Sequence, residues 1–195
     1  WVVLQPPPFR GISESELINF YGAVADGCTL QVGIQNAPEY MGIGLSIESI
    51  IELNKQHRNI SILKAEGPAT YIAELNQRSN NAFSIFNGRN GLELTDNLRA
   101  GCKGIIPGVD VCDQQSRIYN LFREGKSLEA DRLYMEILPL LFFLMTSIDH
   151  LVCYGKRLAG RRLGFKAIHD RSPGQRPNSF GLATLEHWSN ILQKF

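Results

Sequence analysis

Short apolar runs of the β type alternate along this chain with longer segments in which apolar residues recur at helical spacing. The short runs predict strands at Val2–Gln5, Leu30–Gln35, Ile60–Lys64, Phe83–Phe86 and Gly104–Ile106. The longer segments predict helices near Glu14–Ala25, Ile47–Gln56, Ala69–Arg78 and Leu92–Ala100. Because strands and helices alternate, we expect an α/β fold with parallel strands, as a small doubly wound sheet or as part of a barrel.

The pattern changes after the last of these strands. Residues 113–162 predict two or three consecutive helices, because apolar residues such as Leu121, Leu133 and Ile137 recur at helical spacing. Residues 171–177 are rich in Pro, Gly and Ser and predict a loop, and a final helix is expected near Leu182–Leu192. We therefore expect an α/β region over residues 1–110 and a helical region over residues 111–195.

Composition and charge narrow the classes of partner. The chain has 195 residues, of which 44% are hydrophobic and 20% charged, and this is typical of a globular protein. A formal net charge of +1 provides no field that would recruit nucleic acid or a membrane. We interpret the local basic cluster as a solvated helix face rather than a phosphate site; it consists of Lys156, Arg157, Arg161 and Arg162.

Cysteine and histidine spacing favours neither a metal site nor a disulfide framework. The four cysteines form no C-x-x-C pair, so reduced thiols in the cytoplasm are expected. The four histidines lack metal-ligand spacing, and structural or surface roles are favoured for them. The apolar stretch Ile137–Met145 is too short to span a bilayer and contains a proline, so we expect a buried helix and no membrane partner.

Lys64 is the most informative residue of the strand ends, where parallel α/β folds place their active sites. Alternation places Lys64 and Glu66 on one strand face together with Ile60 and Ile62. Burial disfavours the charged form of a lysine and increases the fraction of free amine that can act as a nucleophile. Two interpretations remain open: a nucleophile, or a lysine that reaches solvent or pairs with Glu66.

Gln35 ends the preceding strand. Val32 and Ile34 form an apolar face suited to covering helices, whereas Gly33 and Gln35 point to the other side. The Gln35 amide is either a substrate contact or a satisfied structural hydrogen bond. Other strand ends carry glycines that allow close backbone approach, as in Asn87–Gly91.

Taken in order, these strand ends resemble the dihydrodipicolinate synthase / N-acetylneuraminate lyase family. Leu4–Phe9 resembles its fourth-strand segment, in which a proline precedes aromatics, and Gln35–Pro38 falls on its Tyr-Asn-x-Pro element. Ile62–Glu66 falls on the sixth strand, whose lysine forms an imine with the substrate. Phe86–Asn90 resembles the glycine motif of the seventh strand, and Ala100–Gly108 resembles the eighth strand.

The resemblance implies a (β/α)₈ barrel, of which residues 1–110 would supply strands four to eight. Residues 111–195 would then supply the last barrel helix and a C-terminal helical extension. It also implies that about three strand–helix units are absent from this chain. The family commonly forms tetramers and uses no metal or organic cofactor, so a homo-oligomer with no cofactor is expected.

Two positions depart from the family pattern. Gln35 stands where the family has a catalytic tyrosine, and Tyr40 stands where the synthases have an arginine that binds a distal carboxylate. Both departures argue against dihydrodipicolinate synthase itself. The resemblance is greater to the branch that dehydrates 2-keto-3-deoxy sugar acids, with Lys64 attacking the C2 carbonyl and Glu66 moving protons or positioning water.

The resemblance also implies a set of substrate contacts beside the catalytic Lys64 and Glu66. These predicted contacts are Gln35, Asn87, Gly88, Arg89, Asn90, Ile106 and Phe9. A pyruvate-releasing aldolase is the alternative reaction, although it requires a base on the C4 hydroxyl, which is the usual role of the absent tyrosine. A catalytically silent barrel with a binding role is a third hypothesis.

Overall fold

The computed structural model describes residues 1–8 and 11–192, and the chain forms two compact units. Unit 1 comprises Trp1–Gly88 and Asp96–Ile106. Unit 2 comprises Arg89–Thr95 and the chain from Pro107 onward.

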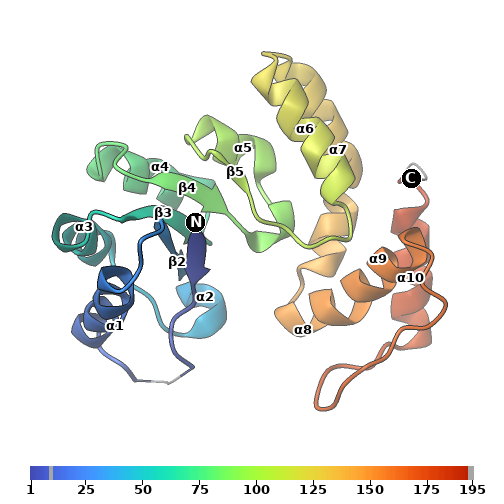
Figure 1. The fold of residues 1–195 in the computed structure, drawn as a ribbon. Helices are drawn as coiled ribbons and strands as arrows, with labels where there is room; N and C mark the ends of the chain where they lie inside the picture. Colours follow the sequence, from blue (N-terminus) through green and yellow to red (C-terminus); the bar gives the residue numbers. More distant parts are fainter. Residues whose placement is uncertain (9–10, 193–195) are drawn as a thin grey trace. The chain divides into compact units, whose positions relative to one another are not determined.

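Unit 1 contains a parallel sheet of five strands in the order β1-β2-β3-β4-β5 (Figure 1). The strands are β1 (Val2–Leu4), β2 (Val32–Asn36), β3 (Ile60–Ala65), β4 (Ser84–Asn87) and β5 (Gly104–Ile105). The predicted strands and their parallel direction are confirmed. Each strand lies beside its predecessor in the sequence, whereas a doubly wound sheet reverses its strand order at a switch point. The observed order is therefore that of a barrel wall.

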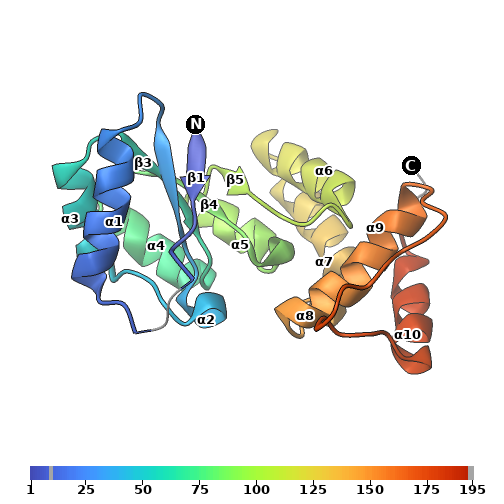
Figure 2. The same cartoon turned by 60° about the horizontal axis from the view of Figure 1, so that its bottom comes forward.

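Helices cover one face of this sheet (Figure 2). The helices of unit 1 are α1 (Glu14–Asp26), α2 (Pro38–Met41), α3 (Ile47–Gln56) and α4 (Ala69–Arg78), and α5 (Leu94–Arg99) begins in unit 2. A capping box formed by Ser13 and Glu16 begins α1. Apolar residues of α1, α3 and α4 pack against alternate strand residues such as Val32, Ile34 and Leu63. The short α2, which follows β2 immediately, had no helical signal long enough to predict it.

The prediction that Ile60 lies on the same strand face as Lys64 is wrong. Val32 pairs with Ile60 but Gly33 pairs with Ile62, so β3 holds one extra residue at Ser61 and contains a β-bulge. The extra residue reverses the alternation, and Ile60 therefore packs in the helix-covered core with Leu63. Ile62 lies on the opposite face, beside Gly33.

Unit 2 is helical in the part of it that the structure describes. It contains η1 (Arg89–Gly91), α6 (Cys112–Arg123), α7 (Ser127–Leu144), α8 (Ile148–His150), the π-helix η2 (Leu151–Gly155), α9 (Lys156–Arg162) and α10 (Ser179–Ser189). Helices α6 and α7 lie side by side, and α10 packs against α7 and η2. Within the described residues no single helix meets the length and hydropathy of a membrane span, although α7 and the segment Ile148–Arg162, bent by 103°, meet them together.

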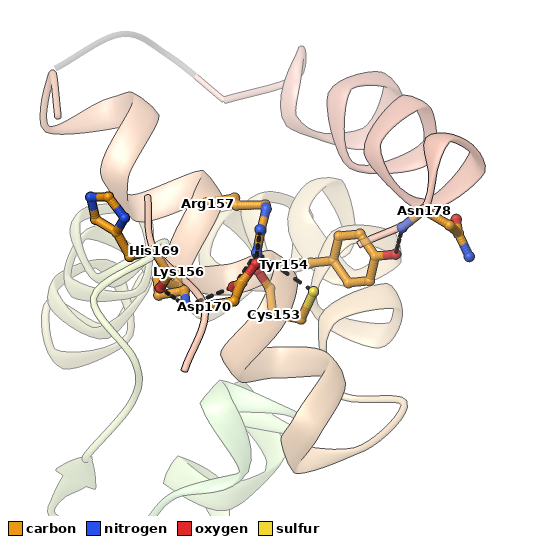
Figure 3. Close-up of polar contacts among 7 residues, drawn as sticks. All are labelled: Cys153, Tyr154, Lys156, Arg157, His169, Asp170 and Asn178. Atoms are coloured by element: carbon orange, nitrogen blue, oxygen red, sulfur yellow. Dashed lines mark hydrogen bonds and ion pairs between the residues drawn. The ribbon is translucent and has the colours of Figure 1, made fainter. Parts of the chain in front are cut away.

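The basic cluster is not the solvated helix face that its sequence suggested. Lys156 and Arg157 both bind the Asp170 carboxylate, as Figure 3 shows. Arg162 binds the Asp113 carboxylate at 2.7 Å, and Arg161 binds the Ser189 hydroxyl. The four cations are therefore bound to the chain's own acceptors, and two of them fix the loop that precedes α10.

We expect Asp170→Asn to release that loop. Arg157 and then Lys156 hold the pKa of the Asp170 carboxyl well below its usual range, and the variant removes both ion pairs. Because this pKa is depressed, the ion pairs of Asp170 stabilise the folded loop at pH values above the pKa of an unfolded aspartate, about 4. This stabilisation is lost as the pH falls below that value. Hydrogen exchange over residues 164–178 should be faster in the variant at pH 7 and unchanged in Asp149→Asn, since Asp149 is exposed. Equal exchange in Asp170→Asn and wild type would contradict this expectation.

Candidate active site

Polar side chains line up across three strands of unit 1 at their carboxyl ends. Gln35 pairs with Lys64, and Lys64 pairs with Phe86 on β4. Gln5, the residue after β1, donates a hydrogen bond from Nε2 to Oε1 of Gln35 at 3.1 Å. These side chains lie on the face opposite the helices, because Ile34 and Leu63, their neighbours along the strands, pack in the helix-covered core.

Lys64 and Glu66 form the centre of this row. The Lys64 Nζ lies 2.5 Å from Oε1 of Glu66, and the two side chains are only 19% and 8% exposed. The predicted common face of the two residues is therefore confirmed. An ammonium this poorly hydrated is stabilised by its carboxylate partner, and the same contact supplies an acceptor for its proton. The interpretation of Lys64 as a side chain that extends into solvent is wrong, whereas pairing with Glu66 and service as a nucleophile are compatible.

Gln35 belongs to the same cluster. It is 9% exposed, and its Nε2 donates to Oε1 of Glu66 at 3.3 Å. Its amide therefore has a structural partner on each side, Gln5 and Glu66. Oε1 of Glu66 receives both Lys64 and Gln35, which concentrates two donors on one oxygen.

Gly88 makes room for the Glu66 carboxylate. A Cβ atom at position 88 would lie 2.6 Å from Cδ of Glu66 and 2.9 Å from its Cγ, both far closer than van der Waals contact. Only glycine therefore allows the carboxylate to lie against the end of β4, beside Lys64. The sequence assigned Gly88 to the substrate, and the structure adds this packing role.

The Asn87 side chain points away from this cluster. It is fully buried, and its Nδ2 donates to the Gly67 carbonyl at 2.9 Å and to Oδ1 of Asn97 at 2.7 Å. The preceding residue on the same helix-covered face is Ile85. The structure therefore does not bring the Asn87 amide together with Lys64, and its contacts connect β4 with α5. Alternation alone could have indicated this, because Asn87 and Phe86 occupy opposite faces.

Three of the remaining predicted contacts, Ile106, Arg89 and Asn90, have partners of their own. The Ile106 amide donates to the Asn87 carbonyl at 2.8 Å, which extends the pairing of β4 and β5. Arg89 and Asn90 belong to unit 2, where Arg89 is paired with Glu93. Asn90 is buried, its Nδ2 donates to Asp110 and its Oδ1 accepts from the Gly108 amide. Phe9 lies outside the described residues.

The described residues contain no group of three or more potential metal ligands among His, Cys, Asp and Glu. His57 binds Asp26 through Nδ1, and His150 packs against the rings of Phe143 and Tyr154. The pKa of His150 is lowered by burial. These two histidines have the structural roles expected for them.

A lysine–carboxylate pair at the carboxyl end of a barrel-type strand agrees with the comparison to known families. The model of the Dihydrodipicolinate synthetase family matches residues 2–163. The chain belongs to this family. The resemblance found in the sequence is thereby confirmed, and the matched region includes Lys64, Glu66, Gln35 and Gly88.

Several named proteins resemble the chain in sequence. A 4-hydroxy-tetrahydrodipicolinate synthase of Methanococcoides burtonii is 28% identical over 86% of this chain and 57% of its own length. The synthase of Exiguobacterium sibiricum is 30% identical over 94% of this chain and 62% of its own length. The L-2-keto-3-deoxyarabonate dehydratase of Azospirillum brasilense is 26% identical over 72% of this chain and 47% of its own length. The chain thus spans between 47% and 62% of the length of these relatives.

Solved structures of the family share the fold. The 4-hydroxy-tetrahydrodipicolinate synthase of Methylacidiphilum fumariolicum superposes with a TM-score of 0.87 at 22% identity, over 97% of this chain and 63% of that one. The dihydrodipicolinate synthase of Thermotoga maritima gives 0.84 at 18% identity, over 97% and 66%. At these identities the likeness supports the fold alone, and it agrees with the strand order of unit 1.

Gln5 is the member of the cluster that sequence reasoning missed. Its place at the carboxyl end of a predicted strand is evident from the sequence. No residue type or spacing marked it, however, because its role depends on the pairing of β1 with β2.

Proposed function

We propose that this chain is the part of a Schiff-base lyase that forms an imine with a 2-keto acid, and that Lys64 is the nucleophile. Members of the family are lyases of this kind. The observation that carries the proposal is the contact of 2.5 Å between Lys64 and Glu66, on the face of the sheet away from the helices. It supplies an amine and a proton acceptor at the strand end where such enzymes bind substrate.

The reaction begins with proton transfer from Lys64 to Glu66, which leaves a free amine. The amine attacks C2 of the 2-keto acid. The carbonyl oxygen takes one proton from the amine and one from Glu66 and leaves as water, which gives a protonated imine. The imine withdraws electrons from C3, so a base can remove the C3 proton and form an enamine. The enamine electrons then expel the C4 hydroxyl, which takes the proton removed from C3 and leaves as a second water. Hydrolysis of the conjugated imine frees the product and Lys64.

Dehydration of a 2-keto-3-deoxy sugar acid is our preferred reaction. Gln35 replaces the tyrosine that would serve the C4 hydroxyl in an aldol cleavage, and an amide does not relay protons near neutral pH. One relative is named as a dehydratase of a 2-keto-3-deoxy sugar acid, which supports this choice. Other relatives are named as 4-hydroxy-tetrahydrodipicolinate synthases. The pyruvate-releasing aldolase is the second candidate, because its reaction passes through the same imine.

Incubation with 2-keto-3-deoxy sugar acids separates these two reactions. A 2-keto acid product with one water fewer than the substrate supports dehydration. Release of pyruvate together with an aldehyde supports the aldolase instead. Mass spectrometry of the products distinguishes the two outcomes directly, because only the aldolase divides the carbon chain.

Glu66→Gln is expected to reduce turnover by roughly 10²–10⁴-fold, because the amide cannot accept the Lys64 proton. The substitution is nearly isosteric and leaves the space beside Gly88 filled, so the fold should persist. Steady-state kinetics measure the effect, and Glu74→Gln is the matched control because Glu74 is exposed on α4 and pairs with Arg78. Unchanged turnover in Glu66→Gln would remove Glu66 from the mechanism.

The wider architecture is part of the same proposal. We propose that residues 1–110 supply strands four to eight of a (β/α)₈ barrel and that residues 111–195 supply its last helix and a helical extension. Three further strand–helix units would complete the barrel. A cytoplasmic homo-oligomer without cofactor is proposed on the resemblance alone. The proposed substrate contacts in unit 1 are Gln35 and Gly88, together with the backbone near Ile106.

A further inference from the structure

Gln5 and Gln35 form a directed pair of amides. A glutamine side chain has an acceptor oxygen and a donor NH₂ group, so it can turn either end toward a neighbour. Nε2 of Gln5 donates to Oε1 of Gln35 at 3.1 Å, and this leaves Nε2 of Gln35 to donate to Glu66 at 3.3 Å. The orientation of the second amide thus follows from the first.

The orientation matters at Oε1 of Glu66. That oxygen lies 2.5 Å from the Lys64 Nζ and also accepts the Gln35 hydrogen bond. If the Gln35 amide turned over, its own oxygen would face the carboxylate, and two acceptors would repel each other in a poorly hydrated place. Glu66 would then lose the donor that holds its oxygen toward Lys64.

We propose that Gln5 is a positioning residue for imine formation, which acts through Gln35 on the Glu66 carboxylate. This inference rests on the proposed Schiff-base chemistry of Lys64. Where the family has the hydroxyl of a tyrosine, this chain has the Gln35 amide. The Gln5 amide determines which end of Gln35 acts as the donor. Gln5 itself is exposed, so its replacement perturbs the orientation of Gln35 without opening the apolar core.

The test is the rate at which pyruvate forms a borohydride-trapped adduct on Lys64, measured across pH 6–9 in Gln5→Leu and Gln5→Glu. Leucine removes the donor, and glutamate substitutes an acceptor that favours the reversed amide. We expect the rate to fall roughly tenfold in Gln5→Leu and further in Gln5→Glu. The added negative charge of Gln5→Glu should also move the rate profile to higher pH, because it favours the protonated amine. Gln31→Glu adds the same charge at the opposite end of β2 and should leave rate and profile unchanged.

A double-mutant cycle separates positioning from a general structural effect. In a Gln35→Leu background, Gln5→Leu should cause no further loss, because the amide through which Gln5 acts is gone. Wild-type rates in both Gln5 variants would overturn the proposal, and so would a full loss that persists in the Gln35→Leu background. In either case, adduct formation in the wild type would still support the lyase proposal. Absence of any adduct in wild type would instead overturn the lyase proposal, and this inference with it.

Discussion

Lys64→Arg is expected to abolish turnover, with a fall of at least about 10³-fold, while the protein remains folded. Arginine keeps a positive charge opposite Glu66, whose side chain is only 8% exposed, so the carboxylate retains a partner. A guanidinium remains protonated in proteins and does not form the imine. The loss should therefore appear in catalysis and be nearly absent from the unfolding midpoint, as measured by steady-state kinetics and by thermal denaturation.

Lys64→Ala is the companion variant. It removes the nucleophile and also leaves the Glu66 carboxylate without its cation, which should cost about 1–3 kcal/mol of stability. The two variants should thus be equally inactive but differ in stability. Turnover in Lys64→Arg close to that of the wild type would contradict the role of Lys64. Equal stability of the two variants would contradict the structural role of the ion pair.

Gly88→Ala is expected to impair both stability and catalysis, although Gly88 carries no reactive group. The new Cβ would overlap the Glu66 carboxylate and lie 2.6 Å from its Cδ, so the carboxylate must move away from Lys64 and Gln35. Overpacking of this kind typically costs about 1–3 kcal/mol. Displacement of the proton acceptor should lower turnover by roughly 10²-fold or more. Chemical denaturation and steady-state kinetics measure the two effects.

Gly27→Ala is the matched control for this variant. A Cβ at Gly27 would find its nearest neighbours at 3.7 Å and 3.8 Å, which is ordinary contact. The same change of one methyl group should therefore leave activity unaltered. If Gly88→Ala retained wild-type turnover and stability, Glu66 would not occupy the place against β4 that the structure gives it.

The strands and most helices could be predicted because their signals are local. Ile47–Gln56 and Ala69–Arg78 were predicted with the bounds observed for α3 and α4, since apolar periodicity and flanking turn residues mark both ends. The common face of Lys64 and Glu66 was also correct, because the two residues lie beyond the irregularity in β3. The family resemblance followed from strand ends in the right order.

The bulge at Ser61 could not be predicted. Its sequence, a serine among apolar residues, alternates as regularly as an undisturbed strand, and the extra residue is visible only in the pairing of β2 with β3. The interpretation of the basic cluster as a solvated helix face was wrong for a similar reason. Asp170 and Asp113, which bind its cations, lie outside the cluster in the sequence, and only the tertiary fold brings them there.

Three side chains of the candidate site were predicted, but the contacts that hold them in place were not. Lys64, Glu66 and Gln35 were identified from strand ends and resemblance, and the structure brings them together. Gln5 and the packing role of Gly88 depend on distances across neighbouring strands, which periodicity does not contain. Asn87 was placed with the substrate by motif, but its side chain is bonded on the helix-covered face.

Trapping with pyruvate and borohydride tests the central role of Lys64 most directly. Trypsin cleaves after Arg58 and Lys64, but reduction of an imine at Lys64 blocks the second cleavage. Imine formation on Lys64 predicts a longer peptide, Asn59–Arg78, that carries the mass of the reduced pyruvyl group and is absent from Lys64→Arg. An unmodified Asn59–Lys64 peptide after reduction, or an adduct on another lysine, would contradict it.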